Sequence, residues 1–168
     1  MANKTSFTGD EWSRVLSSPM VAGMAITAAD PSGLWGLLKE GMAGGWALLE
    51  ARQSADADPL VKATAEDFAT NEGRAATRTA LQQRFTSTTF SAIKDTALAE
   101  LKGVAGILDG KAPENAAAFK AWLLQVAQKA AEAGTEGGFL GFGGVAVSEA
   151  EKATLAEIAA ALNGKGSA

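Results

Sequence analysis

Alanine occupies 37 of the 168 positions of this chain, and this bias restricts the fold more than any other feature of the sequence. Alanine has the highest helix propensity of all residues. Leucine, isoleucine and valine recur among the alanines at three- and four-residue spacing, which places them on one face of a helix. The only stretch that resembles a strand, residues 145–147, is too short to anchor a sheet. The chain is therefore predicted to be all-α.

Two helix starts are marked by capping boxes. Thr8 and Glu11 have the required spacing, and so do Ser148 and Glu151. In this arrangement the first side chain accepts a hydrogen bond from the third residue of the helix, and that residue's side chain bonds back. We therefore predict that a helix follows each of these pairs.

Prolines mark further helix starts, because proline is well tolerated in the first turn after a capping residue. The pairs that carry this signal are Ser18-Pro19, Asp30-Pro31 and Asp58-Pro59, and Pro113 also opens an apolar period. At Ser18 we predict that a short first helix ends and that a second helix begins. The pattern predicts a bundle of about seven helices in a single domain over residues 1–168, with a flexible tail at 164–168.

A glycine-rich segment at residues 134–147 interrupts the helical pattern, and it is unusually apolar for a loop. It carries Phe139, Leu140 and Phe142 among glycines. These three side chains either fold inward and plug one end of the bundle, or form an exposed patch for a protein partner, a second copy of the chain or a membrane surface. The four tryptophans, in contrast, lie on predicted helices, and we expect them in the core; they are Trp12, Trp35, Trp46 and Trp122.

The residue types exclude most catalytic chemistry. The chain has no histidine, cysteine or tyrosine, so it lacks the commonest general base and the strongest nucleophile. The net charge of −4 does not suggest the positively charged surface that binds nucleic acid. The one modest basic group, Arg74, Arg78 and Arg84, is interpreted as a solvated helix face. We therefore expect no enzymatic activity and no nucleic-acid partner.

Carboxylates are the remaining metal ligands, and they favour hard cations such as Ca²⁺ or Mg²⁺. Asp30 and Glu40 form a candidate acidic site of this kind, although Asp30 also suits a helix N-cap before Pro31. No other cofactor is expected.

Residues 22–40 end a small-residue helix in Ala-Ala-Asp, turn tightly, and begin another helix; residues 121–162 repeat this outline with a longer turn. Such paired hairpins resemble the two halves of tellurite-resistance B-like helical domains. The resemblance implies an all-α bundle in a stress-response or signalling system, with Asp-Gly turns whose acidic side chains bind divalent metal. Asp30 matches the aspartate of the first turn, but Pro31 replaces the glycine. Glu136-Gly137 stands at the second turn.

The beginning of the chain lacks the apolar core of a signal peptide. The longest charge-free run, Val15 to Ala29, contains Pro19 and is shorter than the roughly 18 residues of a spanning helix. We expect a cytoplasmic protein without a transmembrane segment. Its function is predicted to be non-enzymatic interaction or scaffolding, through a protein partner or a homo-oligomer. The alternative is binding of a divalent metal or a small ligand.

Overall fold

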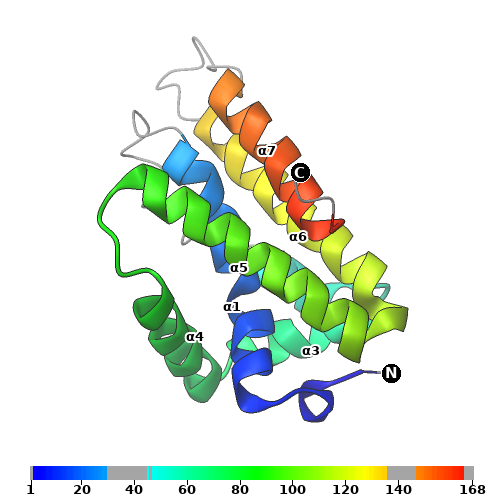
Figure 1. Cartoon of the computed structure of the whole chain (residues 1–168). Helices are drawn as coiled ribbons and strands as arrows, with labels where there is room; N and C mark the ends of the chain where they lie inside the picture. The colour runs from blue at the N-terminus through cyan, green and yellow to red at the C-terminus, as the bar shows by residue number, and fades with distance from the viewer. Residues whose placement is uncertain (1, 30–44, 46, 136–146, 165–168) are drawn as a thin grey trace.

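The computed structural model describes residues 2–29, 45, 47–135 and 147–164. Within these ranges the prediction of an all-α bundle is confirmed, because the elements are helices packed together and no strand is present (Figure 1). The helices are η1 (Lys4–Ser6), α1 (Gly9–Ala29), α3 (Pro59–Phe68), α4 (Asn71–Arg84), α5 (Phe90–Lys111), α6 (Pro113–Thr135) and α7 (Glu149–Leu162). Residues 47–53 are also helical.

Helix α1 is the centre of the bundle, and it contacts α3, α4, α5, α6 and α7. In Figure 1, α5 crosses in front of α1. Helices α6 and α7 lie side by side, and both contact α1. The largest fully buried side chains come from α1, α3, α5, α6 and α7; they include Leu16, Leu60, Leu101, Phe119 and Ile158. One continuous apolar core therefore joins both halves of the described chain.

The prediction that the chain restarts at Ser18-Pro19 is wrong, because α1 runs unbroken through Pro19. Proline has no N–H, so it cannot donate to the carbonyl four residues earlier, which belongs to Val15. The Ser18 hydroxyl donates to that same carbonyl oxygen at 2.7 Å, and Ser18 is completely buried. The serine thus satisfies the acceptor that the proline leaves open, and the helix continues.

Both predicted capping boxes are confirmed. The backbone N–H of Thr8 donates to Glu11 Oε2 at 2.7 Å, and the N–H of Glu11 donates to Thr8 Oγ1 at 3.3 Å. At the start of α7 the N–H of Ser148 donates to Glu151 Oε2 at 2.8 Å, and the N–H of Glu151 donates to Ser148 Oγ at 3.2 Å. The hydrogen bond from the Thr8 backbone, helped by Lys111, lowers the pKa of Glu11 below 4.5.

This lowered pKa predicts an acid-dependent loss of stability. A carboxylate whose pKa is lower in the folded state stabilises the fold above the unfolded-state pKa and loses that contribution as the pH falls through the folded-state value. We therefore expect Glu11→Gln to be less stable than wild type near neutral pH, with the difference shrinking as the pH falls from about 5 through the lowered pKa of Glu11. Urea midpoints measured across this range check the prediction. Parallel curves for the two proteins would contradict it.

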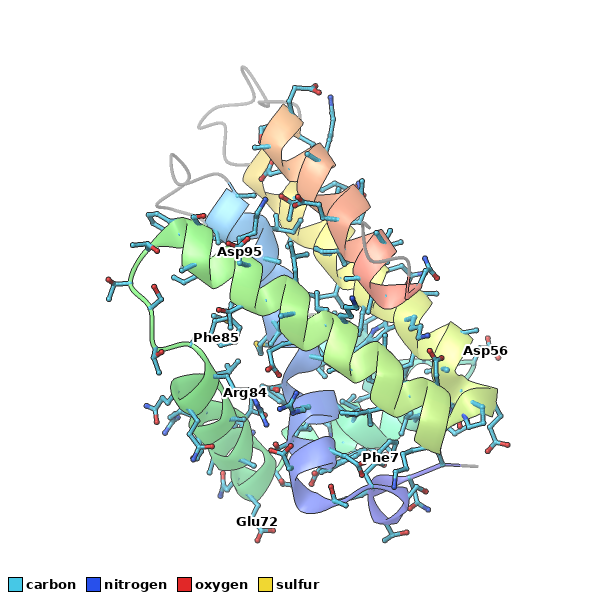
Figure 2. The ribbon with its side chains drawn as sticks, in the orientation of Figure 1. Phe7, Asp56, Glu72, Arg84, Phe85 and Asp95 are labelled. Atoms are coloured by element: carbon cyan, nitrogen blue, oxygen red, sulfur yellow. The ribbon has the colours of Figure 1, made fainter. Side chains whose placement is uncertain are left out.

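Helix α4 is the most polar helix of the bundle, and its buried residues are the small ones Gly73, Thr77 and Ala80. Arg74 and Arg78 on its outer side are exposed, as predicted for a solvated face. Arg84 is not solvated, which corrects that prediction, because only 13% of its side chain is exposed. Figure 2 places it at the end of α4 beside α1.

Arg84 belongs to an ionic cluster formed by Asp10, Arg14, Arg84 and Glu100. Its guanidinium lies 2.9 Å from Asp10 Oδ1 and 3.4 Å from Glu100 Oε2. Arg14 contacts the same two carboxylates at 3.2 Å and 3.6 Å. Positive and negative groups thus alternate across α1, α4 and α5. The sequence of α4 predicted an exposed Arg84. Arg84 is largely buried instead, because it contacts these two acidic side chains on other helices.

Candidate functional site

A groove of about 240 Å³ lies between residues 47–53, the segment that leads into α3, and α6. Helix α6 lines it with one face over three turns, because the lining residues recur at three- and four-residue spacing; they are Ala118, Ala121, Trp122, Gln125, Val126 and Lys129. The opposite wall comes from Ala47, Glu50, Ala51 and Ser54, and Ala57, Asp58 and Val61 complete the lining. The groove therefore extends about 16 Å along α6.

Trp122 is the one aromatic residue among the described residues that line the groove. Its ring packs edge-on against Phe119, with ring centroids 5.2 Å apart and an interplanar angle of 75°. Phe119 is completely buried in the core, so this contact fixes the indole at the boundary between core and groove. Trp122 itself is only half-buried, and Ala118 and Ala121 lie next to it on the groove face of α6. The groove therefore has a rigid aromatic wall among small side chains.

An ion pair crosses the groove, since Lys129 on α6 donates to Glu50 Oε2 on the opposite wall. Both side chains are largely exposed, at 49% and 66%. Asp58 contributes a second carboxylate, which is held from two directions. Its Oδ1 accepts from the backbone N–H of Leu60 at 2.9 Å, and its Oδ2 accepts from Asn115 Nδ2 at 2.9 Å. The lining thus combines an apolar surface with a few fixed charges.

The polar side chains of the groove lie beside its apolar surface. Among the residues that line the groove, the carboxylates of Glu50 and Asp58 are engaged with Lys129 and with the start of α3. Glutamine and serine provide neutral hydrogen-bonding groups nearby. A ligand could exploit such groups for orientation, as polar atoms do in mostly apolar binding sites.

The candidate site residues predicted from the sequence cannot be compared with this groove. Phe139, Leu140 and Phe142 lie outside the described residues, and so do Asp30 and Glu40. The roles expected for them stay predictions. In the part of the chain that the structure describes, no group of three or more acidic side chains could hold a metal ion.

The expectation that the tryptophans lie in the core is confirmed for Trp12, whereas Trp122 is partly buried, packing against the core and also lining the groove. Trp35 and Trp46 lie outside the described residues. Trp12 is 5% exposed, and its indole N–H donates to Asp67 Oδ2 at 2.6 Å. Trp122 was missed as a groove residue because its helical spacing equals that of the core residues on α6. A signal was available in the alanines at 118 and 121, which leave room beside a large ring.

No described helix combines the length and apolar character needed to cross a membrane. Comparison of the chain with protein-family models, curated proteins and solved structures finds no match. The resemblance to tellurite-resistance B-like domains therefore stays a prediction.

Proposed function

We propose that the protein is a non-enzymatic interaction module, and that its groove receives a side chain of a partner protein. The observation that carries this proposal is the half-buried Trp122, which packs edge-on against the buried Phe119 and lines the groove with Ala118 and Ala121. Tryptophan is enriched among the residues that contribute most to protein interfaces, particularly where it lines a pocket. A rigid ring loses little conformational freedom when a partner packs against it.

The dimensions of the groove favour a protein partner over a cofactor or a metabolite. Its volume is about 240 Å³, whereas sites for drug-sized molecules typically have volumes of about 300–1,000 Å³. It is large enough for one long side chain. The small alanine side chains on both walls also let a partner's backbone approach closely. No observation on the described residues favours the alternative of divalent-metal binding.

A pair of alanine substitutions on α6 tests the proposal. Ala121 lines the groove and Ala117 does not, while both are exposed on the same helix. We expect Ala121→Trp to fill the groove and to abolish capture of the partner from cell extract, whereas Ala117→Trp retains it. Circular dichroism establishes that both variants keep the helical fold. If Ala121→Trp captures the same proteins as wild type, the groove is not the interaction site.

A further inference from the structure

We propose that the side chain which enters this groove is an arginine of the partner protein. The inference rests on the proposed function, and it adds the chemistry of the occupant. It draws on three features of the groove: the sign of its charges, the exposure of its ion pair, and the combination of an indole with an aliphatic wall.

The charges of the lining favour a cation. Among the described residues that line the groove, Glu50 and Asp58 contribute two carboxylates and Lys129 contributes the one ammonium. This described lining therefore carries one negative charge in excess. Asp58 is fixed by its bonds to the start of α3 and to Asn115, so its charge keeps its place when the groove is empty. A cationic side chain would complement this charge distribution, and an anionic one would be repelled.

The ion pair between Glu50 and Lys129 leaves room for this cation. Lys129 contacts one carboxylate oxygen, Oε2, and a carboxylate can accept several hydrogen bonds through its two oxygens. Both residues are largely exposed, and exposed ion pairs of this kind contribute little to stability. An incoming guanidinium can therefore bond to Glu50 beside Lys129 or replace it. Lys129 competes with the ligand for the same carboxylate.

The indole and the alanines distinguish arginine from a small cation. The three methylenes of arginine can lie along apolar surface while the charged end reaches polar groups. Here the exposed Ala118 and Ala121 supply that surface on α6. A guanidinium stacks on aromatic rings and bonds carboxylates through a planar fork, which an ammonium does not do. Trp122 and Glu50 line the same groove and suit these two contacts.

Capped tripeptides test the inference in a titration followed by nuclear magnetic resonance. The probes are acetyl-Gly-Arg-Gly-amide and the same peptide with citrulline, which has nearly the shape of arginine without its charge. We expect the arginine peptide to bind more tightly and to shift the amide signals of Ala118, Ala121 and Gln125. Glu50→Gln is expected to weaken the arginine peptide about two- to fivefold, and Lys129→Gln to tighten it by a similar factor. The citrulline peptide is expected to be insensitive to both substitutions.

Each other outcome is decisive. Equal binding of both peptides, or weaker binding of arginine to Lys129→Gln, overturns the arginine assignment but leaves the groove as an interaction site. If neither peptide shifts signals from the groove, the proposed function loses its support as well. Analytical sedimentation at the same protein concentrations tests whether a second copy of the chain occupies the groove. If the chain forms a dimer and the arginine peptide dissociates it, the occupant of the groove is a second copy of this chain. The assignment to a different protein is then overturned.

Discussion

Replacement of Phe119 by alanine is expected to lower the free energy of unfolding by about 3–5 kcal/mol, the usual range for removal of a buried phenylalanine. The ring is completely inaccessible, and it packs edge-on against Trp122. Its loss removes apolar burial and leaves a cavity that α6 cannot close without shifting toward α1. Urea denaturation followed by circular dichroism measures the change.

Phe90 provides a matched control, because the same substitution there removes a ring that is 36% exposed at the start of α5. We expect Phe90→Ala to cost about 1 kcal/mol or less, since surface substitutions have small effects. Equal losses at the two positions would mean that Phe119 does not belong to the core. The comparison also removes the general effect of introducing alanine into a helix, because both positions are helical.

Replacement of Gly73 by alanine is the second substitution with a large expected effect, and its sign runs against helix propensity. Alanine favours a helix by about 1 kcal/mol over glycine. A Cβ at position 73, however, would lie 2.0 Å from the backbone oxygen of Asp67 and 2.6 Å from its carbonyl carbon. The Asp67 side chain is held by Trp12 and Lys4, so this backbone resists displacement. We expect a net loss of about 1–3 kcal/mol, as for other overpacked sites.

Gly106 is the control for this steric argument. It lies inside α5 on the exposed side, and a Cβ there would meet nothing within 4 Å. We expect Gly106→Ala to raise the free energy of unfolding by about 0.5–1 kcal/mol. Thermal and urea unfolding of both variants should therefore shift in opposite directions. Shifts of the same sign would show that the close approach at Asp67 does not limit position 73.

Helix boundaries could be predicted from the sequence where the decisive bonds are local. The capping boxes at Thr8 and Ser148 join residues three apart, so their spacing alone contains the information. Ser18-Pro19 misled the prediction because the same two residues can start a helix or continue one. The choice depends on whether the serine hydroxyl reaches the Val15 carbonyl inside a buried helix, and tertiary packing decides that.

The groove could not be predicted, because its two walls are far apart in the sequence: Glu50 and Lys129, which pair across it, are 79 positions apart. Nothing near Glu50 indicates that Lys129 will face it, and the alanines near Trp122 do not say which helix lies opposite them. Arg84 was misjudged for the same reason, since its partners Asp10 and Glu100 belong to other helices. Periodicity reports which face of a helix is apolar, whereas pairing across the bundle depends on the final arrangement of the helices.

The ionic cluster also restricts how this sequence can diverge. Loss of Arg84 would leave Glu100, whose side chain is 17% exposed, with Arg14 at 3.6 Å as its neighbouring cation. Loss of Glu100 would leave two guanidiniums to share Asp10, whose side chain is 71% exposed. Either single substitution leaves a poorly compensated charge between helices. Each is therefore expected to be less stable than the protein with both residues present or with both replaced. Substitutions at positions 84 and 100 should therefore accumulate as pairs in diverging lineages, and this covariation would preserve the attachment of α4 while its outer surface drifts freely.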